Sequence, residues 1–265
     1  SGTKTKLIIV STPYGMNQFY KLWTDAENKR NDYVPIEVHW SEVPGRDEKW
    51  KEDTIRNTSP EQFQQEFECE FLGSVNTLIS PAKIKNIVFK TPLKSNAGLD
   101  VYEEPKKGAT YVCTVDVARG VNKDYSAFII LDVSQMPYKV VCKYRSNDVK
   151  PILFPHTIDR VAKAYNHAHI LVEVNDLGQQ IAEALQFELE YDNLLMTTQR
   201  GRAGQILGAG FSGRGSGFGV RMTKQIKKIG CSNIKTLIES DKILVNDFNI
   251  IEEMSTFIKK GQSWM

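Results

Sequence analysis

The chain has 265 residues, of which 41% are hydrophobic and 25% charged, a composition that suits one large globular domain, or one domain and part of another. Its formal net charge of +2 is nearly balanced, so attraction to a polyanion must come from local clusters of lysine and arginine. No apolar run approaches the roughly 18 residues that span a membrane, and the N-terminus lacks the layout of a signal peptide. These features argue against a membrane or secreted protein and predict a cytosolic one.

The N-terminal part of the chain alternates apolar runs with helical patterns. Residues 6–15 (KLIIVSTPYG) are apolar and β-branched before Ser, Thr, Pro and Gly, which predicts a buried strand that leads into a loop. A helix is expected after it, because Phe19, Leu22 and Trp23 share one helical face. Residues 33–40 (YVPIEVHW) predict a second strand.

Ser59 and Pro60 open the next helical pattern, at its N-cap and first helical positions, and this pattern continues to Gly73. Composition and pattern both change in the polar segment that follows. We therefore predict two domains, residues 1–75 and residues 76–265.

The second domain has a distinctive order of elements. Three strand patterns separated by short turns precede alternating helix and strand patterns. Strands are expected at 110–118 (TYVCTVDVA), 126–133 (SAFIILDV), 138–146 (YKVVCKYRS), 169–176 (HILVEVND), 193–198 (NLLMTT) and 242–247 (KILVND), and helices at 155–166, 177–190, 222–240 and 249–261. This is the order of the α/β ribonuclease H-like fold, a mixed sheet flanked by helices, although other α/β folds share parts of it.

Two of the predicted strands carry a carboxylate among apolar residues: Asp116 on the first and Glu173 on the fourth. An ionised carboxylate in such surroundings costs several kcal/mol unless a cation or hydrogen bonds offset it. An ion pair or a loop cap is the ordinary explanation for one such acid. In the ribonuclease H-like order, however, these two strands are neighbours, so the acids would converge and repel unless a divalent cation lies between them. We expect Asp116 and Glu173 to bind Mg²⁺ or Mn²⁺, in a two-metal site for phosphodiester hydrolysis.

Other candidate ligands are weaker. Asp124, before the second strand, is either an auxiliary ligand or a cap of the hairpin turn, whereas Asp132 and Asp176 are interpreted as strand-end and helix-cap residues. His167 and His169 lack a third zinc ligand nearby. The four cysteines are far apart without a CxxC pair, which predicts reduced thiols and no structural zinc.

Residues 199–228 (QRGRAGQILGAGFSGRGSGFGVRMTKQIKK) are rich in glycine and basic residues and contain no acid. Their glycines do not match a dinucleotide-binding fingerprint. The segment is either a solvated loop or a basic flap over DNA phosphates, and the clustering of cations on a nearly neutral protein favours the flap. The predicted DNA-binding residues are Arg200, Arg202, Arg214, Arg221, Lys224, Lys227 and Lys228.

Several segments, in this order and spacing, resemble the large terminase subunit of T-even-like tailed bacteriophages, and the resemblance spans essentially the full chain. Residues 116–132 (DVARGVNKDYSAFIILD) are similar to the first nuclease motif of that family, HILVEVND to its second acid motif, and QFQQEFECEFLG to the segment that closes its ATPase domain. TKLIIVSTPYGMNQFYKLW resembles the ATPase coupling region, where Ser11 and Thr12 match positions that link hydrolysis to motion.

The resemblance implies a P-loop ATPase domain that drives DNA translocation, followed by a ribonuclease H-like nuclease that cuts concatemeric phage DNA at the initiation and termination of headful packaging. Residues 1–75 match the end of that ATPase domain. Because no GxxxxGK[ST] phosphate loop occurs in the sequence, ATP is expected to bind only in the missing N-terminal part.

Asp116 and Glu173 match the first two members of the family's metal-binding acidic triad. The third member, an Asp in a His-Asp-Asp segment after an SW pair, would fall just beyond Met265. The nuclease domain is therefore expected to be truncated before its last acidic motif, which places its activity in question.

The partners that the resemblance implies are double-stranded phage DNA, the portal protein of the procapsid and the small terminase subunit, with no membrane. The expected location is the host cytoplasm, at the procapsid portal during packaging. The incomplete acid set leaves an alternative open: a DNA-gripping module of the translocation motor that does not cut. A junction resolvase is a further alternative, which the ATPase-like N-terminal segment disfavours.

Overall fold

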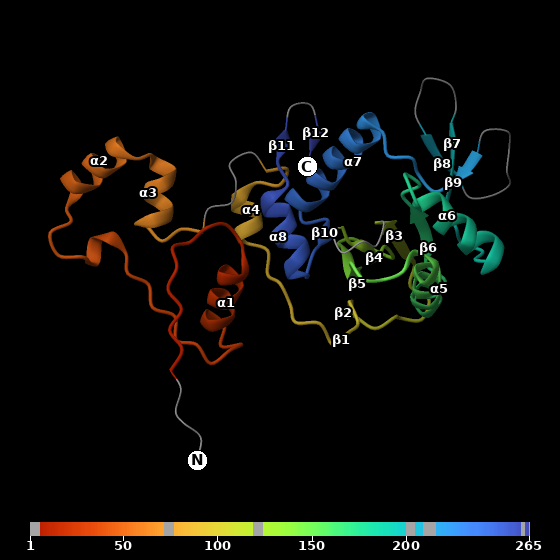
Figure 1. Ribbon diagram of the computed structural model, residues 1–265, viewed down its shortest axis with the longest axis horizontal. Coiled ribbons are helices and arrows are strands. Elements are labelled where there is room, and N and C mark those ends of the chain that lie inside the picture. The colour runs from red at the N-terminus through yellow and green to blue at the C-terminus, as the bar shows by residue number, and fades with distance from the viewer. Residues whose placement is uncertain are drawn as a thin grey trace, which may run out of the picture. The chain divides into compact units, whose positions relative to one another are not determined.

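The computed structural model describes residues 6–71, 77–118, 124–199, 205–208, 216–260 and 263–264 (Figure 1). The chain divides into two compact units: residues 1–86 with 248–259 and 265, and residues 87–247 with 260–264. These units differ from the predicted division at residues 75 and 76, because the first unit takes in residues 77–86 and a helix near the C-terminus. The division at residues 75 and 76 stays a prediction.

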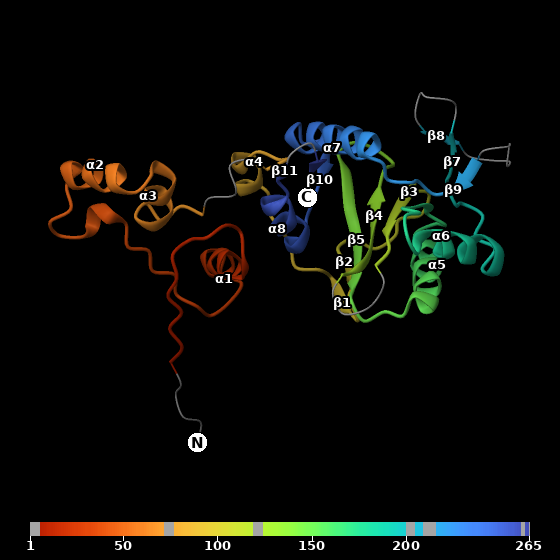
Figure 2. The ribbon, with the colours of Figure 1, turned by 45° about the horizontal axis from the view of Figure 1, so that its top comes forward.

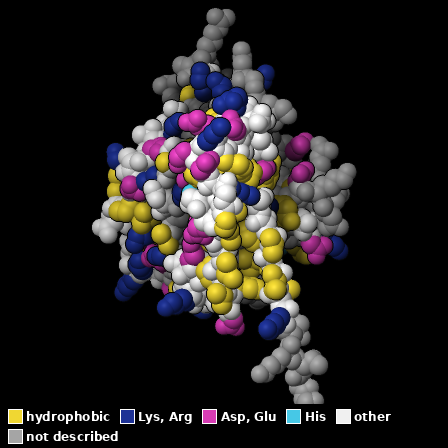
Figure 3. All heavy atoms as spheres, turned by 90° about the vertical axis from the view of Figure 1, so that its left-hand side faces the viewer, with side chains coloured by type: hydrophobic (Ala, Val, Ile, Leu, Met, Phe, Trp, Pro, Cys, Tyr) yellow, Lys and Arg dark blue, Asp and Glu magenta, His cyan; other side chains and the backbone are white. Residues whose placement is uncertain are grey.

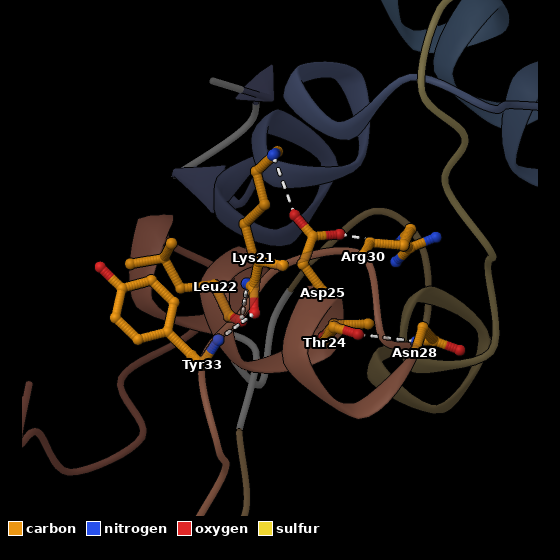
Figure 4. A network of polar contacts seen from close by, with 8 residues as sticks. Lys21, Leu22, Thr24, Asp25, Asn28, Arg30 and Tyr33 are labelled. Atoms are coloured by element: carbon orange, nitrogen blue, oxygen red, sulfur yellow. Dashed lines mark hydrogen bonds and ion pairs between the residues drawn. The ribbon is translucent and has the colours of Figure 1, made fainter.

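The first unit is helical. Its helices are α1 (Gln18–Glu27), the 3₁₀ turn η1 (Trp40–Glu42), α2 (Glu48–Asn57), α3 (Pro60–Glu66), α4 (Pro81–Lys85) and α8 (Phe248–Thr256). The N-cap of α3 is Ser59, whose hydroxyl accepts a hydrogen bond from the Gln62 amide, and Pro60 opens the helix, as predicted. A carboxylate at the end of α1 joins two cations: Asp25 contacts Lys21 at 3.1 Å and Arg30 at 2.8 Å (Figure 4).

Helix α3 ends at Glu66, earlier than the predicted Gly73. The amide of Glu70 hydrogen-bonds to the Gln64 carbonyl, and Cys69 has a φ of 56°, a left-handed conformation that ends a helix. An aromatic cluster of Trp40, Trp50, Phe63 and Phe67 forms here, with ring centroids 5.3–6.1 Å apart. The helix therefore ends where Phe67 packs into this cluster.

The two strands predicted in this unit, at residues 6–15 and 33–40, are wrong. Both segments lack strand pairing among the described residues, and their apolar side chains are exposed; Val10 is 88% and Val34 is 80% accessible. Figure 3 shows hydrophobic side chains at the surface on the side that carries α2 and α3. A β-branched run becomes a strand only where a neighbouring strand takes up its backbone hydrogen bonds, and the described residues of this chain supply none.

The second unit is built around a mixed sheet whose strands lie in the order β1-β2-β5-β4-β3-β6, with β10 also pairing with β5. The strands are β1 (Lys94–Asn96), β2 (Leu99–Val101), β3 (Tyr111–Asp116), β4 (Ser126–Asp132), β5 (Tyr138–Ser146), β6 (His169–Val172) and β10 (Ile243–Leu244). β3, β4 and β5 are antiparallel neighbours, whereas β6 is parallel to β3. The structure thus confirms the predicted ribonuclease H-like order, with the first and fourth predicted strands side by side.

A second, three-stranded sheet has the order β8-β7-β9. Its strands are β7 (Met196–Gln199), β8 (Gln205–Gly208) and β9 (Ser216–Phe218), and two further short strands, β11 (Lys259–Lys260) and β12 (Ser263–Trp264), follow α8. The helical elements of the unit are η2 (Pro151–Leu153), α5 (Phe154–Ala164), α6 (Gly178–Glu183), the π-helical turn η3 (Ala184–Glu188) and α7 (Lys224–Glu239).

The core of this unit fills one face of the large sheet, on the side of α5 and α6 (Figure 2). Ile158, Val161 and Ala162 are buried on the predicted apolar face of α5, because helical spacing places them on one stripe. Phe128 and Tyr144, from neighbouring strands, stack at 5.1 Å between centroids. Burying this face fixes which side chains of each strand point inward and which point to the opposite face.

One predicted cap in this unit is wrong. The N-cap of α6 is Leu177, and no side chain caps the helix. Asp176, the residue predicted for that role, has a φ of 50° and belongs to the turn before the helix. The helix begins at Gly178, one residue later than the sequence pattern indicates.

Candidate metal and nucleic-acid site

Asp116 and Glu173 lie at the carboxyl ends of two neighbouring parallel strands. Asp116 is the last residue of β3, where it is exposed, and Glu173 follows the last residue of β6. Val115 and Val172 are partners in the register, and the Glu173 amide donates a hydrogen bond of 2.9 Å to the Val115 carbonyl. The fold therefore brings the two predicted acids to one edge of the sheet.

The two carboxylates interact electrostatically. Burial raises the pKa of Glu173, repulsion by Asp116 raises it further, and the ammonium group of Lys227 acts in the opposite direction. A pair of oxygen donors whose negative charges repel each other fits a divalent cation, which favours carboxylate ligands and would relieve the repulsion. The chemistry of this donor set is compatible with Mg²⁺ or Mn²⁺.

Two glycines shape the backbone around Glu173. A Cβ atom on Gly178 would lie 1.8 Å from the Glu173 carbonyl oxygen, and one on Gly219 would lie 2.2 Å from the Val172 carbonyl oxygen. Gly219 also has a φ of +69°. Sequence reasoning treated these glycines as part of a loop and a helix start, and missed that the acid-bearing strand end packs directly against them.

Replacement of Gly219 by alanine is expected to destabilise the protein by about 2–4 kcal/mol, because the new methyl group meets backbone and a positive φ is strained. Gly230 is a matched control: it lies within α7, and a Cβ atom there would meet nothing within 4 Å, so Gly230→Ala is expected to stabilise by about 0.5–1 kcal/mol. Urea denaturation of the two variants measures both changes. Equal stability of the Gly219→Ala variant and the unmodified protein would contradict the close packing at this glycine.

The segment after Gly219 runs alongside the acid-bearing strand end and then enters α7. Val220 forms a parallel bridge with Glu173, and the Val174 amide donates to the Val220 carbonyl at 2.9 Å. The side-chain amide of Asn175 both donates to and accepts from the backbone of Met222, at 3.1 Å each. These bonds fix the start of α7, which is capped by Thr223, next to Glu173.

Four of the predicted DNA-binding residues are in this region. Arg221 precedes α7, and Lys224, Lys227 and Lys228 lie in its first turns. Lys227 is half-buried and acts on Glu173, whereas the other three are exposed. The helix has no acidic residue in its first turn, so these positive charges add to the positive end of the helix dipole. Arg200, Arg202 and Arg214 lie outside the described residues.

Other candidate ligands do not join the pair. Asp124 lies near the start of β4, at the same end of the sheet as Asp116, because Asp116 pairs with Ala127. Asp132 lies at the opposite end of β4 and accepts a hydrogen bond from the Ser134 amide at 3.0 Å, which confirms its strand-end role. Within the described part of the chain, no group of three or more His, Cys, Asp or Glu side chains is placed to hold a metal ion.

The cysteines are free thiols, and Cys113, Cys142 and Cys231 are buried. Burial is the main cause that raises the pKa of Cys142 to about 12, so this thiol stays protonated and packs as a small apolar group. No helix in the described residues has the length and apolar character needed to cross a membrane.

Two family models match the chain. The model described as "Terminase RNaseH-like domain" matches residues 113–263, and the model described as "Terminase large subunit, T4likevirus-type, N-terminal" matches residues 1–86. The chain belongs to the terminase large-subunit family. The first match contains both Asp116 and Glu173, and it confirms the family that the sequence motifs indicated.

Curated relatives of this terminase chain are the large terminase subunits of Thermus virus P23-45 and Thermus phage G20c, each 22% identical over 267 residues. The alignments cover 94% of this chain and 48% of each relative, so the chain spans about half the length of the curated relatives it matches.

Solved structures support the fold. The large terminase nuclease of phage G20c, in a structure with bound magnesium, superimposes with a TM-score of 0.53 at 18% identity, over 72% of this chain and 86% of that one. The large terminase nuclease domain of Thermus phage P74-26 gives a TM-score of 0.50 at 19% identity, over 71% and 83%. These terminase structures share the ribonuclease H-like architecture described above.

Proposed function

We propose that this terminase chain carries the metal-dependent endonuclease of viral DNA packaging, which cuts concatemeric phage DNA at the start and end of headful packaging. The observation that carries the proposal is the convergence of Asp116 and Glu173 at the ends of adjacent strands. Family membership and the metal-bound structure of the G20c nuclease support it.

Asp116 and Glu173 would hold Mg²⁺ or Mn²⁺, as one or two ions. When bound, such a cation supplies an activated water and charge stabilisation for phosphodiester hydrolysis. The protein itself would position the metal and the DNA. The β3–β6 hydrogen bonds hold the two acid-bearing strand ends side by side, and the basic start of α7 would hold DNA phosphates beside the carboxylates. Arg200, Arg202 and Arg214 belong to the same proposed DNA-binding set as Arg221, Lys224, Lys227 and Lys228.

The wider proposal concerns the assembled motor. Residues 1–75 would be the end of the packaging ATPase domain and its hinge, with ATP bound elsewhere in that domain, and residues 76–265 the nuclease domain. The partners would be double-stranded phage DNA, the portal protein of the procapsid and the small terminase subunit. The protein would act in the host cytoplasm, docked at the portal during packaging.

A second candidate function is a DNA-gripping module that holds DNA during translocation and does not cut. One observation favours it: within the residues that the structure describes, two carboxylates converge and no third acid joins them. Gripping uses the same basic residues and needs no metal, so metal dependence separates the two functions.

The test is cleavage of supercoiled plasmid by an active preparation of the protein, with Mg²⁺, with Mn²⁺ and with EDTA. Asp116→Asn is expected to abolish cleavage while keeping the melting temperature, because the carboxylate is exposed and the amide preserves its shape. Asp132→Asn, at the opposite end of the sheet, is the matched control and is expected to cut normally. Full cleavage by the Asp116→Asn variant would overturn the proposal.

A further inference from the structure

Arg145 and Tyr125 form a cation–π pair at the same end of the sheet as the two carboxylates. The guanidinium carbon of Arg145 lies 3.8 Å from the centroid of the Tyr125 ring, and 40% of the tyrosine is exposed. Neither residue has a role in the predicted site. A guanidinium group that lies over an aromatic ring keeps its positive charge, so the ring can position it while it still attracts an anion.

The strand register places Arg145 on the face of the sheet that carries Asp116. Asp116 on β3 pairs with Ala127 on β4, and Ala127 pairs with Arg145 on β5. The adjacent row of Val115, Phe128 and Tyr144 is buried in the core on the other face, so the row of Asp116 and Arg145 points away from that core. Two strand spacings of about 4.8 Å separate the two residues, or about 10 Å.

The backbone of Arg145 is held firmly. Its amide donates a hydrogen bond of 2.9 Å to the Gly98 carbonyl in the turn between β1 and β2. Gly98 has a φ of +83°, and a Cβ atom there would lie 2.5 Å from the Arg145 carbonyl oxygen. The close approach of this turn fixes the end of β5 and hence the origin of the arginine side chain.

The path of helix α7 avoids this corner of the sheet. The helix starts beside Glu173, at the carboxyl end of β6. Its other end lies beside the start of β5: the Lys242 amide donates a hydrogen bond to the Leu237 carbonyl, and the Lys242 carbonyl accepts one from the Tyr138 amide. Tyr138 and Arg145 lie at opposite ends of β5. The helix thus runs between two diagonal corners of the sheet, and Arg145 is at neither.

Two carboxylates at one edge would repel the phosphates of a nucleic acid, so a strand that crosses them needs cations on both sides. Lys227 supplies one on the side of Glu173. We propose that Arg145, positioned by Tyr125, supplies the other by binding a backbone phosphate of the DNA strand within about three nucleotides of the one at Asp116, given the rise of about 3.4 Å per nucleotide. This inference rests on the proposed function, since it assumes that the strand to be cut lies over Asp116.

The test is binding of a short fluorescein-labelled DNA duplex in EDTA, followed by fluorescence anisotropy over a series of salt concentrations. Arg145→Ala is expected to weaken binding about tenfold and to reduce the slope of log K against log salt by about one, as for loss of one phosphate contact. Arg145→Lys should keep the slope. Tyr125→Leu should weaken binding about two- to fivefold without changing the slope, because the charge remains and its support is lost.

Arg160 is the matched control: it is an exposed arginine on α5, the helix that covers the other face, so Arg160→Ala should leave both affinity and slope unchanged. Circular dichroism establishes that each variant is folded, and Arg145→Gln replaces the alanine variant if that one is not. An unchanged slope in a folded Arg145→Ala or Arg145→Gln variant would overturn the inference. The slope is measured in EDTA without cleavage, so it tests the Arg145 contact separately from the proposed nuclease, which the plasmid cleavage assay tests.

Discussion

Replacement of Glu173 by glutamine is expected to reduce cleavage about a thousandfold or more and to leave the protein as stable as before, or more stable. The loss follows because an amide is a poor ligand for a divalent cation that stabilises the transition state by several kcal/mol. The folded protein is expected to stay as stable because burial and repulsion by Asp116 disfavour the negative charge on Glu173, and glutamine carries no charge. Rates of plasmid nicking and thermal melting in EDTA measure the two effects.

The same electrostatics predict a pH dependence. Because the pKa of Glu173 is higher in the folded than in the unfolded protein, the folded state binds the proton more tightly. The stabilisation from this group is fully present below the unfolded pKa of about 4.3 and is lost as pH rises through the folded pKa. The Glu173→Gln variant should lack this component of the pH profile in EDTA.

Glu183 provides the matched control, since it lies at the end of α6 and accepts a hydrogen bond from Gln179 one turn earlier. Glu183→Gln should cut normally and should retain the component of the pH profile that Glu173 contributes. A double variant, Asp116→Asn with Glu173→Gln, should lose little more activity than the worse single variant, because the two acids act as a unit. Additive losses, or normal cleavage by Glu173→Gln, would contradict a shared site.

The second large effect concerns a buried ionic cluster on the face of the large sheet that also carries Asp116 and Arg145. The Lys143 ammonium group lies 2.5 Å from a carboxylate oxygen of Asp247 and 3.2 Å from one of Asp100, and the Tyr102 hydroxyl donates to Asp247. Lys143 is 4% and Asp247 is 1% exposed. Burial and the bond to Asp247 raise the pKa of Tyr102, so this hydroxyl remains a donor.

Lys143→Met is expected to cost about 3–5 kcal/mol, because it leaves two carboxylates in a buried site without their cation. The loss should lower the melting temperature by roughly 10 °C or more. The control is Lys139→Met on the same strand, where the lysine is 35% exposed and lies 3.6 Å from Glu103; this change should cost less than about 1 kcal/mol. Equal losses in the two variants would show that the buried cluster contributes no more than a surface pair. Adding Asp247→Asn to Lys143→Met should recover part of the loss, since it removes one of the two negative charges that Lys143 neutralises.

In the N-terminal unit, the local sequence pattern predicted a helix start correctly but predicted two strands that the structure does not contain among its described residues. The caps at Ser59 and Pro60 were predictable, because an N-cap depends on residues within one turn. The apolar runs at residues 6–15 and 33–40 have strand propensity, but a strand also requires a neighbour, and residues far away in sequence decide whether one is present. The sequence pattern could not supply that information.

The hairpin of β1 and β2 was missed for a related reason. Its strands are three residues each and the first is exposed, so no apolar alternation marks it. The signal was in the turn: Ala97 and Gly98 both have positive φ, at 48° and 83°, as a two-residue hairpin turn requires. This turn is also the element that fixes Arg145.

The sequence by itself determined the ribonuclease H-like order of strands and helices, the family, and the two acids at apolar strand ends, since each of these depends on residue type and on spacing along the chain. The tertiary structure alone decided what surrounds those acids. Gly178 and Gly219 against the backbone of the acid-bearing strand end, Lys227 opposite Glu173, and Arg145 in line with Asp116 all result from strand register and helix placement. Register is set by burial of one whole face of the sheet, a property of many residues together that no single motif contains.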